Sequence, residues 1–291
     1  MKIKIRILLL VLLGLSAHSS SALQASSLYT KGIQKIIDRG VLRVAVYEKD
    51  VGPFFMTYKG ELTGIDIKHA KNIARELGVK VDFNRSATSF NGIVDLVASG
   101  EADMAFSKLS YTAERGKKVA YTRPYVLLRK ALMINRLRSA KEKSHRPAST
   151  LTELLNHPDA EIAVIGGSSY EAFMKKLFPQ AKIVGQSSWM PGVWKSVTSR
   201  KTKILAASRD DWEISKILRL LPEANLEIQP VFLKGQKDEI RAVVDPTNQD
   251  LHRFVENYIR TAKTLTVDGI IEEYSDYLDD ISKGFRQQAQ E

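Results

Sequence analysis

The sequence predicts an α/β protein built as two units. Runs rich in β-branched residues alternate with runs that repeat apolar residues at helical spacing, the pattern of sheets covered by helices. This alternation is interrupted by a basic segment at residues 136–148 and then starts again. A chain of 291 residues is long enough for two hydrophobic cores of ordinary domain size.

The first half of the chain has the predicted order β, α, β, α, β. After a short helix at 32–38, the β-branched run Val41–Tyr47 predicts a strand. The next helix is expected to have Asp66 as its N-cap and to stop at Gly78. The remaining elements of this half are a strand at 79–83, a helix at 91–99 and a strand at 102–106. This order implies a doubly wound sheet.

The second half repeats the alternation. The apolar run Val126–Asn135 predicts a strand that leaves the first unit, and the basic segment 136–148 is expected to be an exposed connection. The elements predicted after it are helices at 151–155, 170–177, 193–197 and 212–220, and strands at 162–165, around Ile183, at 204–207 and at 226–232. The last part, with a strand at 240–244 and helices at 251–263 and 270–278, is too small for a third domain.

The N-terminus has the three parts of a secretory signal peptide, predicted for residues 1–25. Lys2, Lys4 and Arg6 precede an apolar run that ends at Leu15, and small residues follow up to Ala22. The apolar run is shorter than the roughly 20 residues that cross a bilayer, which makes a retained anchor the weaker alternative. The mature protein is therefore expected outside the cytoplasm.

Composition excludes several classes of protein. The chain has no cysteine, which excludes disulfides, zinc fingers and thiol nucleophiles. The formal charge of +11 includes three positive residues of the predicted signal peptide. The basic residues are scattered, without the interleaved aromatic residues of a base-stacking surface. A solvated basic surface is favoured over a nucleic-acid site, and an anionic ligand is a further interpretation. The histidines lie far from one another, so neither a metal nor a cofactor is expected.

Three loops follow predicted strands, where ligands of open α/β sheets bind. In the loop 107–115, Thr112 can cap the next helix, and the guanidinium of Arg115 suits a carboxylate. Taken alone, Arg115 is more often a solvated surface charge. In the loop 166–169, two glycines allow close backbone approach and two hydroxyls can bind an anion. A nucleophilic serine is the alternative there, although the G-x-S-x-G pattern is absent.

The third loop and an aromatic group leave their alternatives open. In the loop 208–211, Asp210 or Asp211 could pair with a ligand ammonium, or simply cap the following helix. Tyr47, Phe54 and Phe55 surround the exit of the first strand. They could form an aromatic wall of a pocket, and packing in the core is the default for each phenylalanine.

The order of several motifs between Leu42 and Asn135 resembles a known family. The matching pieces are LRVAVY, GPFF, KGELTGIDIKHAKNIARELGVKVDF and EADMAFSKLSYTAERGKKVAYTRPYV. Looser matches follow in IAVIGGSSYEAF, ILAASRDDW and VDGIIEEYSDYL. The chain resembles the extracytoplasmic solute-binding proteins for amino acids that serve ABC importers, known as family 3.

The resemblance implies a two-lobed α/β clamshell of the periplasmic-binding-protein type II, in which each lobe is a mixed sheet flanked by helices. The chain of such a protein crosses twice between the lobes, which accounts for the small C-terminal part. The implied bounds are 26–40 for a lead-in, 41–131 with 237–286 for lobe one, 132–236 for lobe two and 287–291 for a tail.

The resemblance also implies ligand roles for nine residues. Arg115 corresponds to the residue that binds the ligand α-carboxylate, and Asp210 to the residue that binds the α-ammonium. The other implied positions are Ser107, Lys108, Ser110, Ser168, Ser169, Tyr47 and Phe54. The chain departs from the family pattern at Lys108, where a small residue is usual, and at Arg209, where a neutral one is common.

The expected function is capture of an amino acid or similar small carboxylate in the periplasm, by a monomer that delivers it to an ABC permease. No catalysis, metal, cofactor or nucleic-acid partner is expected. Two alternatives remain. One is an enzyme on the same fold, similar to the periplasmic cyclohexadienyl dehydratases, and the other is a ligand sensor without an importer.

Overall fold

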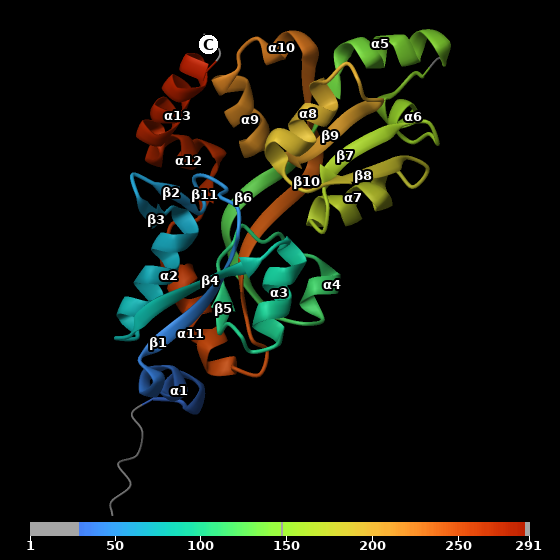
Figure 1. Ribbon diagram of the computed structural model, residues 1–291. Coiled ribbons are helices and arrows are strands. Elements are labelled where there is room, and N and C mark those ends of the chain that lie inside the picture. Colours follow the sequence, from blue (N-terminus) through green and yellow to red (C-terminus); the bar gives the residue numbers. More distant parts are fainter. Residues whose placement is uncertain (1–28, 147, 289–291) are drawn as a thin grey trace, which may run out of the picture.

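A mixed sheet of nine strands runs through the whole molecule (Figure 1). The computed structural model describes residues 29–146 and 148–288, so the predicted signal peptide and most of the predicted tail lie outside the described residues. The strand order is β4-β1-β5-β10-β6-β9-β7-β8, with β11 paired to β6. We call the half that holds β4, β1 and β5 the first lobe, and the half that holds β9, β7 and β8 the second lobe. The predicted α/β class and mixed sheets are confirmed.

The first lobe combines parallel strands with helices on both sides. β1 pairs in parallel with both β4 and β5, as the predicted order of elements requires. Its strands are β1 (Val41–Tyr47), β4 (Lys80–Ala87) and β5 (Met104–Ala105), with the hairpin β2 (Met56–Tyr58) and β3 (Glu61–Thr63). Its helices are α1 (Lys31–Arg39), α2 (Ile65–Glu76), α3 (Phe90–Ala98) and α4 (Ala113–Gly116).

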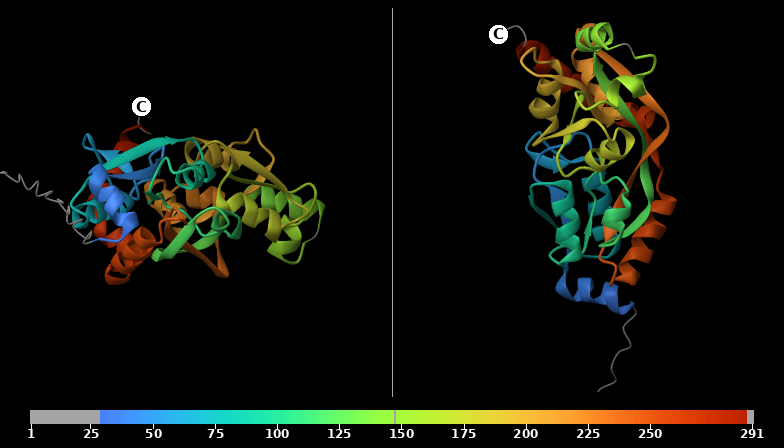
Figure 2. Two further views of the ribbon diagram at one scale, coloured as in Figure 1. Left: turned by 90° about the horizontal axis from the view of Figure 1, so that it is seen from below. Right: turned by 90° about the vertical axis from the view of Figure 1, so that its right-hand side faces the viewer.

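Two long antiparallel strands connect the lobes. β6 (Ala120–Asn135) and β10 (Ile228–Val244) pair with one another and extend from the first lobe into the second, as Figure 2 shows from another side. The prediction that the basic segment 136–148 connects the units is wrong, because α5 (Arg136–His145) lies at the far end of the second lobe (Figure 1). The predicted lobe bounds 131/132 and 236/237 fall inside these two strands and stay a prediction.

The second lobe repeats the arrangement around three strands. β7 pairs in parallel with β8 and β9, and β9 pairs antiparallel with β6. Its strands are β7 (Glu161–Ile165), β8 (Lys182–Gln186) and β9 (Ile204–Asp210). Its helices, besides α5, are α6 (Leu151–Leu155), α7 (Ser169–Leu177), a π-helical turn at Trp189–Val193, α8 (Trp194–Thr198), α9 (Asp211–Leu220) and α10 (Ala224–Glu227).

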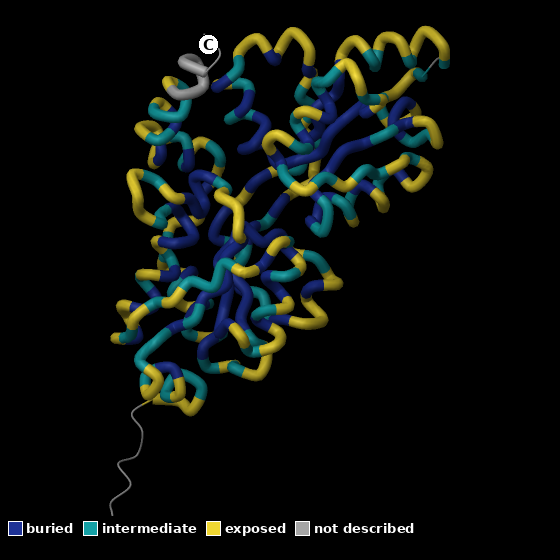
Figure 3. Tube along the Cα trace, viewed as in Figure 1, coloured by how far each residue is buried: buried dark blue, intermediate teal, exposed yellow. Residues whose placement is uncertain are grey.

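The C-terminal segment contacts both lobes. α11 (Gln249–Thr261) packs against β6 and α1, and β11 (Leu265–Thr266) adds a parallel partner to β6. α12 (Val267–Glu273) leads into α13 (Ser275–Gln288), which packs against α9 of the second lobe. Buried residues form a continuous band along the sheet in Figure 3. Among the described residues, no helix is both long enough and apolar enough to cross a membrane.

Asp66 is not the N-cap that the sequence suggested. α2 begins at Ile65 with Gly64 as its N-cap, two residues earlier than predicted, and its first N–H groups donate to backbone carbonyls, Ile65 to Pro53 (2.9 Å) and Asp66 to Phe54 (2.8 Å). Because the preceding loop supplies these acceptors, the helix needs no capping side chain. The buried Asp66 carboxylate instead accepts hydrogen bonds from the Lys108 N–H (2.7 Å) and the Tyr125 hydroxyl (2.7 Å). It thereby fixes the loop after β5.

Candidate functional site

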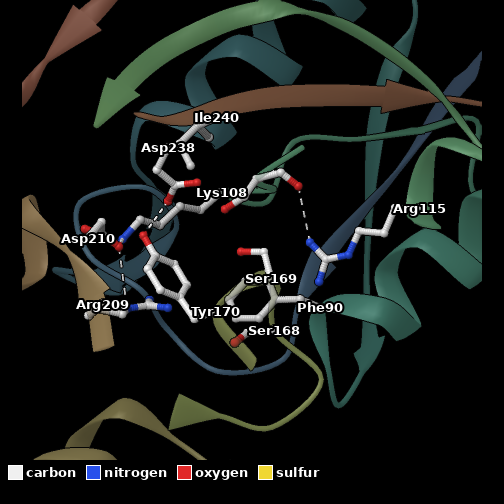
Figure 4. Close-up of a pocket in the computed structure, with 11 residues that line it drawn as sticks. Phe90, Lys108, Arg115, Ser168, Ser169, Tyr170, Arg209, Asp210, Asp238 and Ile240 are labelled. Atoms are coloured by element: carbon white, nitrogen blue, oxygen red, sulfur yellow. Dashed lines mark hydrogen bonds and ion pairs between the residues drawn. The ribbon is translucent and has the colours of Figure 1, made fainter. Parts of the chain in front are cut away.

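A pocket lies between the two lobes, where loops from both meet β10 (Figure 4). The space between its side chains amounts to about 260 Å³, open solvent at its mouth included. The first lobe contributes Phe90, Lys108, Ser110 and Arg115, the second contributes Ser168, Ser169, Tyr170, Arg209 and Asp210, and β10 contributes Asp238 and Ile240.

Six of the nine predicted site residues line this pocket: Lys108, Ser110, Arg115, Ser168, Ser169 and Asp210. The other three lie behind its wall. The Ser107 hydroxyl accepts a hydrogen bond from the Tyr47 N–H at 2.9 Å, and the Tyr47 ring stacks on Phe90 with ring centroids 4.8 Å apart. Phe54 is fully buried, with Lys108 Nζ 4.6 Å from its ring centroid. The ligand roles of all nine residues remain predictions.

Arg115 reaches the pocket from α4. The Thr112 side chain caps this helix by accepting from the Arg115 N–H at 3.2 Å, as the sequence predicts. The guanidinium is buried, and its hydrogen bonds go to neutral oxygens of Asn91 (3.0 Å), Ser110 (3.4 Å) and Gly167 (3.2 Å). Burial lowers its pKa from the usual value, and the residue remains a cation. No carboxylate of a described residue forms an ion pair with it.

Lys108 forms an ion pair across the two lobes. Its Nζ lies 2.9 Å from Asp210 Oδ2 and 3.0 Å from Glu213 Oε1, and all three side chains are almost completely buried. Burial raises the pKa of Glu213, but the charges of Lys108, Lys216 and Arg209 outweigh burial and hold that pKa below its ordinary range. Asp210 and Glu213 are therefore a pair of buried carboxylates that cations of the protein itself neutralise.

The choice between Asp210 and Asp211 is settled by the start of α9. Asp210 lines the pocket and also caps α9, because its Oδ1 accepts from the Glu213 N–H at 3.0 Å. Asp211 points elsewhere and pairs with Arg129 at 2.8 Å. Asp210 therefore caps the helix, which is one of the two roles that the sequence left open, and it also lines the pocket.

Asp238 and Tyr170 are pocket residues that the sequence did not indicate. The Tyr170 hydroxyl donates to Asp238 Oδ2 at 2.6 Å, and Lys130 Nζ lies 3.0 Å from Asp238 Oδ1. Burial raises the pKa of Asp238, but Lys130, Tyr170 and Ser110 outweigh burial and lower it below the usual value. The polar stretch between Phe232 and Ile240 hid the continuation of β10 that carries Asp238.

Arg209, which departs from the family pattern, also lines the pocket. Its guanidinium lies 5.9 Å from the Tyr170 ring centroid and 5.7 Å from that of Trp189. Its buried Nε lies 3.6 Å from Asp210 Oδ2 and its Nη2 4.0 Å from Glu213 Oε1, although Nε makes no hydrogen bond to a described residue. Among the described residues, no group of three or more His, Asp or Glu side chains could hold a metal ion.

Comparison with known proteins shows which family the sequence matches. Residues 42–277 match the family described as bacterial extracellular solute-binding proteins, family 3. A probable histidine-binding protein of Campylobacter jejuni is 33% identical over 75 residues, which are 26% of this chain and 28% of that protein. Other relatives are membrane-bound lytic murein transglycosylases. The chain spans only 27% to 41% of the length of the histidine-binding protein and of these transglycosylases.

Two further similarities extend over most of the chain. The cyclohexadienyl dehydratase of Pseudomonas aeruginosa is 26% identical over 255 residues, which are 86% of each protein. The crystal structure of AncCDT-1, an ancestral amino acid-binding protein and precursor of cyclohexadienyl dehydratase, is 27% identical with a TM-score of 0.64. That match covers 83% of this chain and 98% of the ancestral one. The chain therefore belongs to the bacterial extracellular solute-binding proteins of family 3.

Proposed function

We propose that this protein captures a small carboxylate, such as an amino acid or a related acid, between its lobes in the periplasm and delivers it to an ABC permease. The observation that carries the proposal is Arg115, a buried guanidinium in the pocket that has no carboxylate partner among the described residues. Ser168 and Ser169 line the same pocket from the second lobe. A ligand carboxylate placed between Arg115 of the first lobe and these two serines would contact both lobes.

The family and the pocket support binding more directly than catalysis. An acid catalyst at neutral pH needs a carboxyl that keeps its proton. The pKa of Asp238 is held low, and Asp210 is paired with Lys108. Burial raises the pKa of Asp66 to about 7, but Asp66 lies behind the backbone of Lys108 and does not line the pocket.

Arg115→Ala tests the proposed function. Removing a guanidinium from a buried carboxylate costs roughly 2 kcal/mol or more, so affinity for the bound acid should fall about 30-fold or more. A thermal-shift screen of amino acids and small organic acids first identifies those that raise the melting temperature of the wild type. Isothermal titration calorimetry then measures the affinity of both proteins for these acids. Circular dichroism confirms that the variant is folded.

Arg123→Ala is the matched control, because Arg123 pairs with Glu256 at 2.7 Å outside the pocket. The control variant should bind like the wild type. Equal affinity of Arg115→Ala and the wild type would contradict the proposed role of Arg115.

The relative that is a cyclohexadienyl dehydratase makes an enzyme the second candidate. Turnover of prephenate or arogenate by the purified protein would replace the binding function by catalysis. A stable complex with no turnover supports the proposed function.

A further inference from the structure

Lys108 occupies the carboxylates that the proposed function would offer to a ligand ammonium. Its Nζ is the same chemical group as that ammonium, and it lies 2.9 Å from Asp210 Oδ2 with the lysine side chain only 2% exposed. The other oxygen of Asp210 accepts the Glu213 N–H at 3.0 Å. Both oxygens of Asp210 are therefore already engaged by the protein.

Several contacts hold Lys108 in this position. Its N–H donates to Asp66 at 2.7 Å, its backbone has the left-handed φ of 48°, and its Nζ lies over the Phe54 ring. Glu213 supplies a second carboxylate at 3.0 Å. Removing one partner from such a buried ion pair is strongly unfavourable, so displacing Lys108 by a ligand ammonium would cost a large free energy.

Asp238, the other carboxylate of the pocket, is engaged as well. Its Oδ1 is paired with Lys130 at 3.0 Å and its Oδ2 accepts from the Tyr170 hydroxyl at 2.6 Å. The pocket therefore offers a ligand cation no carboxylate oxygen without a partner among the described residues.

The cations of the pocket have donors to spare. A guanidinium carries five N–H groups. Those of Arg115 meet only neutral oxygens. Arg209 Nε lies 3.6 Å from Asp210 Oδ2, an ion pair without a hydrogen bond, so this N–H can still donate to a ligand. Figure 4 shows Arg115 and Arg209 on opposite sides of the pocket, with Ser169 between them.

The net charge around the pocket also favours an anionic ligand. The lining residues and the ion pairs that connect to them, directly or through Glu213, include five cations against three carboxylates, which leaves two positive charges in excess. The cations are Lys108, Lys130, Arg115, Arg209 and Lys216, and the carboxylates are Asp210, Glu213 and Asp238. Buried charges require partners, so a ligand with two negative charges suits this site.

We infer that the pocket binds a small dicarboxylate without an ammonium group, with one carboxylate at Arg115 and the other at Arg209, while Lys108 substitutes for the ammonium of an amino acid. This inference rests on the proposed function and names its ligand class.

The test uses pairs of acids that differ only in the α-ammonium: succinate with L-aspartate, and glutarate with L-glutamate. Titration calorimetry on the wild-type protein should show that the acid without the ammonium binds at least about tenfold tighter in each pair that binds. Monocarboxylates, L-arginine and L-lysine complete the panel.

The outcomes separate the two proposals. If an amino acid binds as tightly as its deaminated partner, or if binding is confined to amino acids or monocarboxylates, the dicarboxylate class is wrong and the proposed function stands. If no acid of the panel binds, both are wrong.

A variant adds a second test. Lys108→Met removes the ammonium that pairs with Asp210 Oδ2 and leaves room for a ligand ammonium there, so the preference should shift toward L-glutamate over glutarate by at least about tenfold relative to the wild type. Lys118→Met is the control, because Lys118 pairs with Asp95 at the surface and its loss should not change the preference. An unchanged preference in folded Lys108→Met contradicts the role of Lys108. If that variant does not fold, the wild-type comparison still decides.

Discussion

At the scale of single residues, the environment of a charged group determines its role. Lys108 and Arg115 come from the same loop region, yet Lys108 is neutralised by two carboxylates and Arg115 meets only neutral oxygens. A paired cation fixes the shape of the pocket, whereas a cation without a carboxylate partner is free to bind an anion. The two residues therefore serve the same site in different ways.

Asp66 shows the cost of burying a carboxyl. Burial raises its pKa from 3.8 to about 7, although hydrogen bonds from Tyr125 and the Lys108 N–H and the charge of Lys108 act in the opposite direction. Between about pH 4 and pH 7, Asp66 is therefore protonated in the folded protein and ionised in the unfolded chain. Stability contributed by this proton is present at low pH, decreases as the pH rises from about 4 to about 7, and is lost above that range.

Asp66→Asn tests this pH dependence, because asparagine imitates the protonated acid at every pH. The free energy of unfolding of the wild type should decrease relative to the variant between about pH 4 and pH 8. The expected change is roughly 1 to 4 kcal/mol, since each unit of pKa shift corresponds to about 1.4 kcal/mol. Urea unfolding at both pH values measures it, and a difference that does not depend on pH contradicts the raised pKa.

At the scale of elements, backbone geometry decides where helices and strands begin. α2 starts at Ile65 because Gly64 adopts a φ of 121° that brings its neighbours to the carbonyls of Pro53 and Phe54. A Cβ at Gly64 would lie 2.5 Å from the Pro53 oxygen and 2.4 Å from the Phe54 oxygen. Only glycine fits this position.

Gly64→Ala should therefore destabilise the protein strongly. Gly60→Ala is the matched control, since Gly60 also has a positive φ, 82°, but a Cβ there meets nothing within 4 Å. We expect Gly64→Ala to cost at least about 2 kcal/mol more than the control, because it adds a backbone clash to the strain of the left-handed region. Urea unfolding of both variants provides the comparison, and equal costs would show that the start of α2 adapts.

At the scale of the whole molecule, polar contacts hold the lobes together. Lys108 reaches Glu213 at 3.0 Å, Arg115 reaches the Gly167 carbonyl at 3.2 Å, and Lys49 reaches the Ser187 carbonyl at 3.1 Å. The strands β6 and β10 connect the same two lobes. Domain closure depends on such contacts across a hinge, so the pairing of Lys108 favours a closed arrangement without ligand.

Lys108→Met should open the unliganded protein. The variant loses the cation that joins the first lobe to Asp210 and Glu213, and its radius of gyration in small-angle X-ray scattering should exceed that of the wild type. Lys118→Met, which removes a surface ion pair within the first lobe, should leave the radius unchanged. Equal radii for all three proteins would show that Lys108 does not control closure.

The sequence by itself determined the α/β class, most of the elements and the six predicted residues that line the pocket. The class and the elements follow from local patterns, because apolar periodicity marks buried faces. The six residues follow from polar loops after predicted strands together with the family resemblance. The family match over residues 42–277 confirms the predicted family.

Only the tertiary structure decided which charges meet. Asp238 lies in a polar stretch whose strand character depends on pairing with β6, and Lys108 contacts Glu213 although 105 positions separate them in the chain. The burial of Tyr47 and Phe54 behind the pocket wall likewise depends on packing. Local sequence carries no record of such partners, because an ion pair across two lobes exists only once both lobes have folded and met.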